Sequence, residues 1–352
     1  MPPSSAFQWF LLVGPAVVIF AYFLTIFPHT PNELYIHPSL ATLDKSTPSW
    51  SIYPDNFYEG GAYVKFPQGS VRPFCSTSIA FISTNFASQV RYWLVGPENG
   101  KRVVLIHGLS VPAIIWKDVA PKLVAKGYRV LLYDLYGRGY SDAPHTTYDA
   151  NLYTTQLALL LQYVGWSKAN IVGVSMGGGI AAAFSAQFPH LIDDKVVLIA
   201  SAGLMDSSDM SRTTKFLSSP PMQVVASSYP FRLYLQYLAD QKSSSDPIAE
   251  LVRIQSAYLP GYNAALASSI RDGPLRNLAP QFTALGRHSR KTNGSVLAIW
   301  GTHDRVVPYR YAAKVQVYIP HAELVTVEGG PHDITVSHPE EVSNALLEFL
   351  GR

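Results

Sequence analysis

Short apolar runs rich in β-branched residues alternate with longer helical stretches along most of the chain, and this alternation constrains the fold more than any other feature. The runs predict buried strands at residues 103–106, 130–132, 171–174, 196–199, 296–299 and 324–327. The intervening stretches have the spacing of amphipathic helices, at residues 114–126, 151–164, 176–188, 309–318 and 339–350. Near-continuous apolar strands separated by helices predict an α/β fold, with a mostly parallel sheet covered on both faces.

Two intervals depart from this alternation. Residues 78–82 and 90–95 predict a hairpin that opens the domain. Residues 204–293 contain helical pieces without a strand signal, and a structureless loop of that length is uncommon in a compact domain. We therefore expect an inserted helical cap. Most of its aromatic side chains are expected to form the cap's own core, with the lining of an apolar pocket as the alternative; they are Tyr229, Phe231, Tyr234, Tyr237, Tyr258 and Tyr262.

Residues 6–27 are almost wholly apolar. A membrane-spanning helix needs about 20 such residues, so the run predicts a single-pass anchor within residues 1–27, in an endomembrane such as the endoplasmic reticulum or in another membrane. A cleaved signal peptide is the alternative, but no Lys or Arg precedes the run and no small-residue cleavage site follows it. The flanks lack the Lys and Arg excess that sets orientation. We expect a linker and packing arm at residues 28–77, and a catalytic core formed by residues 78–203 and 294–352.

The composition restricts the classes of partner. The formal net charge is +3 and no basic run appears, so the sequence predicts no nucleic-acid partner. The single cysteine, Cys75, rules out an intrachain disulfide and a cysteine-based metal site. We expect neither a metal nor an organic cofactor. The sequence carries no signature of the oligomeric state.

The segment GVSMG at residues 173–177 follows a predicted strand and begins a predicted helix. A serine hydroxyl is a weak nucleophile unless it is exposed and lies beside a base. A tight strand-to-helix turn supplies the exposure and tolerates only small neighbours, which accounts for Gly173 and Gly177. The helix N-terminus also brings backbone N–H groups close to the serine. Ser175 is therefore the predicted nucleophile.

Two later loops supply the predicted acid and base. Asp304 follows a strand in the segment GTHDRVVP, where a carboxylate can hold an imidazole in one tautomer. The alternative role for Asp304 is a helix cap, and Asp206 is the alternative acid. His332 follows the last strand in the segment GGPHD, whose glycines let an imidazole reach the serine. The order Ser175, Asp304, His332 suits a nucleophile on a strand-to-helix turn.

The loop after residues 103–106 is the predicted oxyanion loop. Acyl transfer needs two N–H donors aimed where negative charge develops. We predict that Leu109 supplies one donor and that Met176, the residue after the nucleophile, supplies the other. His107 and Gly108 are expected to support the loop, with His107 acting through its own hydrogen bonds. A second catalytic base is the alternative role for His107.

Five ordered motifs resemble those of the α/β-hydrolase superfamily: LIHG at 105–108, DLYGRGYSD at 134–142, the serine turn, and the acid and histidine loops. The resemblance covers roughly residues 78–350. Among subgroups, the chain is most similar to capped esterases and lipases of the monoacylglycerol-lipase-like and valacyclovir-hydrolase-like kind, and its predicted anchor resembles that of membrane-bound monoacylglycerol lipases. The resemblance implies a structural role for residues 134–142, where we expect Asp134 and Arg138 to form a pair.

The resemblance also implies an activity: a serine hydrolase that cleaves hydrophobic, lipid-like carboxylic esters such as monoacylglycerols. Haloalkane dehalogenases and epoxide hydrolases of this fold use an aspartate where this chain has Ser175, so those reactions are not expected. Thioesterases, amidases, carbon–carbon bond hydrolases and perhydrolases share the same triad and stay open as alternatives. A ligand-binding protein of negligible turnover on the same fold is a further alternative, and the turnover number would separate it from an enzyme.

Overall fold

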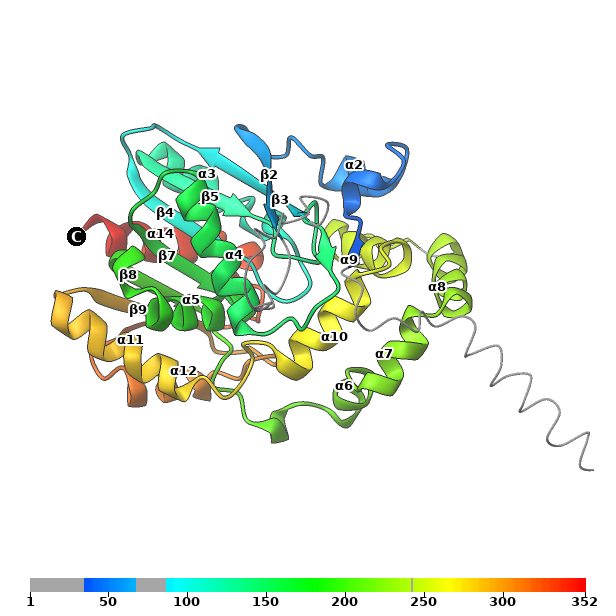
Figure 1. The fold of residues 1–352 in the computed structure, drawn as a ribbon. Coiled ribbons are helices and arrows are strands. Elements are labelled where there is room, and N and C mark those ends of the chain that lie inside the picture. Colours follow the sequence, from blue (N-terminus) through cyan, green and yellow to red (C-terminus); the bar gives the residue numbers. More distant parts are fainter. Residues whose placement is uncertain (1–34, 68–86, 242) are drawn as a thin grey trace, which may run out of the picture.

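The computed structural model describes residues 35–67, 87–241 and 243–352 (Figure 1). The anchor expected within residues 1–27 lies outside the described residues, as does the expected strand at residues 78–82. Among the helices of the described ranges, none combines the length and the hydropathy that crossing a bilayer requires.

An eight-stranded sheet forms the centre of the described part of the chain, in the order β10-β9-β8-β7-β4-β5-β3-β2. β3 pairs antiparallel with β2 and with β5, and the other neighbours are parallel. A second, short sheet joins β1 and β6. The strands are β1 (Ile36–His37), β2 (Gly61–Pro67), β3 (Ala87–Val95), β4 (Lys101–Ile106), β5 (Tyr128–Tyr133), β6 (Ala143–Pro144), β7 (Ala169–Val174), β8 (Ile192–Ile199), β9 (Ser295–Gly301) and β10 (Glu323–Val327).

Helices cover both faces of this sheet (Figure 1): α4, α5, α11 and α12 lie on one face, and α3 and α14 lie on the other. The α-helices are α2 (Pro48–Ile52), α3 (Ala120–Ala125), α4 (Ala150–Tyr163), α5 (Met176–Gln187), α6 (Arg212–Leu217), α7 (Pro220–Ser227), α8 (Tyr229–Gln241), α9 (Pro247–Tyr258), α10 (Tyr262–Asp272), α11 (Ala279–Thr292), α12 (Arg310–Tyr318), α13 (Ile334–Ser337) and α14 (Pro339–Gly351). Short 3₁₀ helices are η1 (Leu40–Thr42), η2 (Ala113–Trp116), η3 (Pro189–Leu191) and η4 (Ser207–Asp209).

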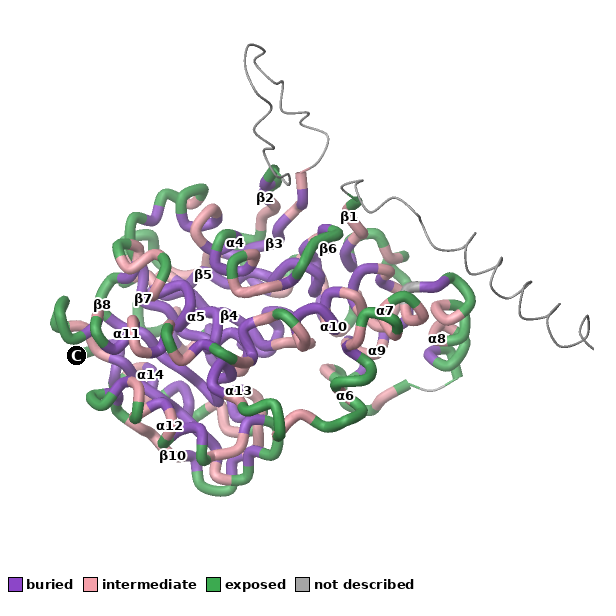
Figure 2. Tube along the Cα trace, turned by 60° about the horizontal axis from the view of Figure 1, so that its bottom comes forward, coloured by how far each residue is buried: buried purple, intermediate pink, exposed green. Residues whose placement is uncertain are grey.

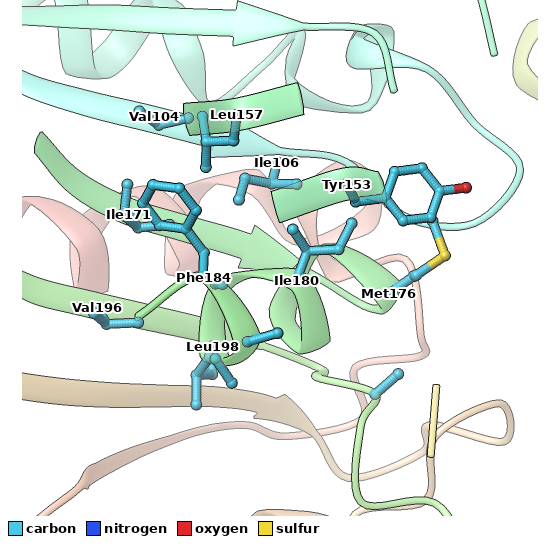
Figure 3. Packing of buried hydrophobic residues seen from close by; sticks show 14 of the residues in the cluster. Val104, Ile106, Tyr153, Leu157, Ile171, Met176, Ile180, Phe184, Val196 and Leu198 are labelled. Carbon is cyan, nitrogen blue, oxygen red and sulfur yellow. The ribbon is translucent and has the colours of Figure 1, made fainter. Parts of the chain in front are cut away.

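The sheet separates two apolar cores, because successive residues of a strand point to opposite faces. In β4, Val104 and Ile106 pack in the core that α4 and α5 cover, whereas Val103 and Leu105 pack in the core that α3 and α14 cover. Figure 3 shows the first of these cores, with Phe184 of α5 packed against the sheet. Burial on both faces explains why the central strands are near-continuous apolar runs, and the predicted mostly parallel α/β fold is confirmed.

Two elements differ from the predictions. The helix expected at residues 114–126 is divided into η2 and α3, and Pro121 lies in the first turn of α3, where its missing N–H is tolerated. Residues 61–67, expected to belong to a linker, form β2 and pair with β3 at the edge of the sheet. β2 alternates buried Val64 and Phe66 with more exposed neighbours, the pattern of a strand with one face in the core.

Between β8 and β9 the chain forms α6 to α11. α11 packs against α5 and α12 and places Phe282 and Leu285 in the core. The interval expected to be a cap therefore includes one helix that belongs with the sheet. The helices α6 to α10, called the cap below, lie beyond the carboxyl ends of the parallel strands (Figure 1).

The entering and leaving segments of the cap are joined at its base. The Gly203 N–H donates to the Leu275 carbonyl at 2.9 Å, and the Leu278 N–H donates to the Gly203 carbonyl at 3.0 Å. Gly203 has a φ of +109°, and an added Cβ would lie 2.8 Å from Phe282 Cε2, so only glycine fits there. The cap is thus one contiguous insertion with a closed base.

The outer helices of the cap expose large apolar side chains, and Figure 2 shows the contrast with the buried sheet. The expectation that the cap tyrosines form its core is wrong for Tyr229, Tyr234 and Tyr237, which are 64%, 55% and 60% exposed. α8 carries apolar residues in every turn, on more sides than α9 can cover. We call the exposed set the cap face; it comprises Phe216, Leu217, Val224, Tyr229, Leu233, Tyr234, Tyr237 and Leu238.

Candidate active site

Ser175 occupies the turn between β7 and α5, with φ 56° and ψ −120°. A positive φ is unfavourable for a residue with a side chain and persists only where the surroundings enforce it. The surroundings here are tightly packed: a Cβ added to Gly173 would overlap the Gly177 carbonyl, and one added to Gly177 would overlap the Ile106 carbonyl. The glycines therefore allow β7, β4 and α5 to meet at a sharp turn with the serine at its tip.

His332 lies between Ser175 and Asp304. Its Nε2 is 2.9 Å from Ser175 Oγ, and its Nδ1 is 2.8 Å from Asp304 Oδ2. Because an ionised carboxylate only accepts hydrogen bonds, Nδ1 carries the proton and Nε2 accepts from the Ser175 hydroxyl. The Asp304 side chain is 0% exposed and that of His332 is 22% exposed. The structure thus brings the three predicted residues into one continuous chain of hydrogen bonds.

Asp304 is oriented by the turn that follows it. Its Oδ1 accepts from the N–H groups of Val306 and Val307, each at 2.8 Å, which leaves Oδ2 for His332. A buried carboxylate needs such partners to offset the loss of water. The alternative acid, Asp206, hydrogen-bonds to Tyr311 and Lys314 instead. One carboxylate oxygen of Asp304 therefore caps the local turn, and the other accepts from the His332 imidazole.

The loop after β4 lies beside the nucleophile. A Cβ added to Gly108 would be 3.3 Å from Ser175 Cβ and 3.7 Å from Ser175 Oγ. Within the ranges that the structure describes, the Leu109 and Met176 amides donate to no other protein group. Met176 begins α5, where the first amides of a helix lack intrahelical acceptors. Both amides are thus available to a bound group near Ser175.

His107 links this loop to the next one. Its Nε2 accepts from the Leu135 N–H at 2.8 Å, so Nδ1 carries the proton and donates to the Gly108 carbonyl at 2.9 Å. The side chain is fully buried, and burial lowers the pKa of His107 to about 3. An imidazole that is neutral at pH 7 and engaged through both nitrogens has no free site for the proton that a second base would take.

The expected pair of Asp134 and Arg138 is not formed. The Arg138 guanidinium donates from Nε to the Leu109 carbonyl at 2.8 Å. Gly137 and Gly139, at φ 79° and 54°, reverse the backbone on both sides of Arg138 and turn it away from Asp134. Burial raises the pKa of Asp134 to about 6, although its carboxylate accepts three hydrogen bonds; the donors are Tyr53 Oη, the Ala113 N–H and the Tyr140 N–H.

Two residues of α10 support the site in roles that the sequence did not predict. The Tyr262 hydroxyl donates to the Ser110 carbonyl at 2.8 Å, and Ser269 Oγ accepts from Arg138 Nη2 at 2.9 Å. No local motif marks them. In the described part of the chain, no group of three or more His, Cys, Asp or Glu side chains is arranged to hold a metal ion.

Comparisons with known proteins identify the fold family. The family described as alpha/beta hydrolase fold matches residues 101–339. An uncharacterized protein of Mycobacterium tuberculosis is 28% identical over 245 residues, which span 66% of this chain and 70% of that protein. The non-heme chloroperoxidase of Streptomyces lividans is 26% identical over 288 residues, which span 76% of this chain and 98% of the relative.

A solved structure extends the likeness to nearly the whole chain. The crystal structure of a membrane phospholipase A, described as a bacterial virulence factor, superposes with a TM-score of 0.62 and 20% identity. The superposition covers 99% of this chain and 98% of the other. At this identity the likeness demonstrates a shared fold.

Proposed function

The chain belongs to the alpha/beta hydrolase fold family, and on that premise we propose that it is a serine hydrolase of carboxylic esters. The observation that carries the proposal is the chain of hydrogen bonds from Ser175 through His332 to Asp304. An imidazole within reach of the serine proton, held in place by a buried carboxylate, is the arrangement that activates a serine.

The proposed reaction has two steps. Ser175 Oγ attacks the ester carbonyl carbon while His332 Nε2 takes the hydroxyl proton, and the Leu109 and Met176 N–H groups donate to the oxyanion. Removal of one such donor typically costs about 3 kcal/mol in the barrier. The alcohol leaves with the proton from His332. Water then gives a proton to the same imidazole and attacks the acyl carbon. Ser175 Oγ leaves with that proton as the acid is released.

We propose further that the substrate is a hydrophobic ester, such as a monoacylglycerol, which the protein meets at a membrane. Residues 6–27 have the length and apolarity of a spanning helix. The described chain begins beside the cap, since a Cβ added to Gly261 would lie 2.7 Å from His37 Cβ. The exposed cap face belongs to the same cap. A membrane phospholipase A has this fold, so lipid esters are a substrate class that the fold accommodates.

Fluorophosphonate labelling of the full chain tests the nucleophile. We expect the wild type to label and Ser175→Ala to lose labelling, because the reagent reacts only with an activated serine. Ser185→Ala is a matched control: Ser185 is a buried serine of the same helix that donates to the Ala181 carbonyl, so its loss should leave labelling unchanged. A folded wild type that does not label would overturn the proposal.

A substrate panel separates ester hydrolysis from the alternatives that share the triad. The panel should hold the acyl chain constant and compare the glycerol ester with the thioester, the amide and a carbon–carbon substrate. We expect kcat/KM to be highest for the ester by about tenfold or more, a difference of about 1.4 kcal/mol in barrier. A protein that labels but turns over no member of the panel has a binding role instead.

A further inference from the structure

We propose that the cap helix α10 positions the oxyanion loop, through Tyr262 directly and through Ser269 by way of Arg138. This inference rests on the proposed hydrolase function and names positioning residues for it. Figure 1 shows α10 between the outer cap helices and the core. The oxyanion loop, defined here as residues 107–110, is then preorganised only while α10 is seated.

Each of three consecutive carbonyls in this loop accepts from a different side chain. His107 Nδ1 donates to the Gly108 carbonyl at 2.9 Å, Arg138 Nε donates to the Leu109 carbonyl at 2.8 Å, and the Tyr262 hydroxyl donates to the Ser110 carbonyl at 2.8 Å. A peptide group is planar, so holding a carbonyl also fixes the N–H of the next residue. His107 thereby aims the Leu109 N–H, and the other two bonds fix the peptide planes that follow it.

Arg138 is a buried cation held by neutral oxygens. Its side chain is fully buried, and no ion pair joins it to a carboxylate within the described ranges. Removing a charge from water is costly unless its donors are satisfied. The guanidinium meets this need with four acceptors. Besides the Leu109 carbonyl, they are the Tyr136 carbonyl at 2.9 Å, Tyr153 Oη at 2.7 Å and Ser269 Oγ at 2.9 Å.

Ser269 Oγ accepts two hydrogen bonds from the core and donates one to the backbone of α10. Ser269 Oγ donates to the Ala265 carbonyl at 2.7 Å, so it accepts both from Arg138 and from the Tyr153 hydroxyl, which is 2.7 Å away. Loss of this single oxygen would leave two buried donors without their acceptor. The position of Arg138, and with it the Leu109 carbonyl, therefore depends on a cap residue.

Tyr262 and Ser269 lie on one face of α10, because residues seven apart are two helical turns apart. Ala265 lies between them on the same face, fully buried, and a Cβ added to Gly137 would meet its Cβ at 2.5 Å. α10 is therefore packed flat against the loop that carries Arg138. A shift of α10 would disturb both of its links to the oxyanion loop together.

The test compares the variant Tyr262→Phe/Ser269→Ala with the wild type, using a soluble p-nitrophenyl ester. We expect kcat to fall by about tenfold or more with KM within about twofold, since small misplacements of preorganised groups act on the transition state. The affinity for an alkyl trifluoromethyl ketone, which adds to the serine as an oxyanion, should fall by the same factor. A loss of packing alone would not produce this match.

Matched controls come from neighbouring residues. Ser268→Ala removes a buried hydroxyl of α10 that bonds Asp272 and the Tyr148 N–H, and Tyr258→Phe removes a hydroxyl that bonds Asp240. Neither group contacts the oxyanion loop, so both controls should retain kcat within about twofold. An equal fall in the controls, or a change confined to KM, would overturn the inference.

Hydrogen exchange separates a failure of this inference from a failure of the proposed function. Amides in residues 107–110 should exchange faster in Tyr262→Phe/Ser269→Ala than in the wild type, whatever the substrate is. Unchanged exchange there overturns the inference while leaving the hydrolase proposal intact. A wild type that reacts with neither the ester nor the ketone overturns the hydrolase proposal, and the exchange comparison still decides whether α10 orders the loop.

Discussion

His107 and Asp134 are buried ionisable residues whose pKa values move in opposite directions. Burial lowers the pKa of His107 to about 3 and raises that of Asp134 to about 6. His107 therefore contributes stability that is present above the unfolded pKa of about 6.5 and lost as the pH falls toward 3. Asp134 contributes stability that is present below the unfolded pKa of about 3.9 and lost as the pH rises through 6. Between pH 5 and 7.5 the two effects partly cancel.

Single variants should separate these effects. We expect the gain in unfolding free energy from pH 5 to pH 7.5 to be about 2 kcal/mol smaller in His107→Asn than in the wild type. In Asp134→Asn the same gain should be about 1 kcal/mol larger, because the opposing titration is removed. Urea unfolding at both pH values provides the comparison. Variants that change the gain in the same direction would show that the titrations are assigned wrongly.

Local motifs made some site residues predictable and left others hidden. Ser175, Asp304 and His332 each follow a strand in a glycine-containing segment, so the sequence placed them at one edge of the sheet. Tyr262 and Ser269 have no such marker, because their role depends on how a cap helix packs against a distant loop. The opposite charges of Asp134 and Arg138 suggested a pair, yet the backbone reversal at the glycines on both sides of Arg138 decided their partners.

Among the elements, α5 shows how a glycine run can be a packing requirement. An added Cβ would overlap a different neighbour at each of three successive positions: the Ile106 carbonyl at Gly177, Ser201 Oγ at Gly178, and the Pro274 carbonyl at Gly179. Ile106 lies at the end of β4, Ser201 follows β8, and Pro274 lies at the base of the cap. The helix start is therefore enclosed by three separate segments.

Substituting these glycines should destabilise the fold in distinguishable ways. We expect Gly178→Ala and Gly179→Ala each to lower the unfolding free energy by about 1–3 kcal/mol, despite the better helix propensity of alanine. Ser201→Gly should restore part of the loss in Gly178→Ala, since it removes the Oγ and Cβ atoms that an added Cβ would meet most closely. It should restore nothing in Gly179→Ala, whose obstacle is backbone. Thermal unfolding measures the rescue, and equal rescue of both variants would contradict this account.

At the scale of the whole molecule, the cap carries the exposed cap face and also contacts the start of the described chain. β1 pairs with β6 next to the cap, and His37 packs against Gly261. Sequence patterns predicted the helical insertion but not this face, because helical periodicity does not reveal which stripe a neighbour will cover. Exposed tyrosines suit a membrane interface, where an apolar ring meets water at one end.

Substituting part of the cap face should weaken activity toward membrane-bound substrate and leave activity toward soluble substrate unchanged. We expect Tyr234→Ser/Tyr237→Ser to raise the apparent KM for an ester embedded in vesicles by about tenfold, because each buried ring contributes about 1 kcal/mol or more. Hydrolysis of a soluble short-chain ester should stay unchanged. Tyr163→Ser/Val317→Ser is the matched control, since both residues are exposed and lie on α4 and α12, away from the cap. Equal losses in the two double variants would refute a membrane-facing cap.

The closed base of the cap has a consequence for how this chain can diversify. Because the Gly203–Leu275 contact joins the entering and leaving segments, the cap could be exchanged by recombination as a single cassette. Such an exchange would replace the cap helices while the inherited nucleophile, base and acid stayed in place. If α10 orders the oxyanion loop, any incoming cassette would still have to carry a tyrosine and a serine two helical turns apart. The other cap helices could then vary, but the inner face of α10 could not.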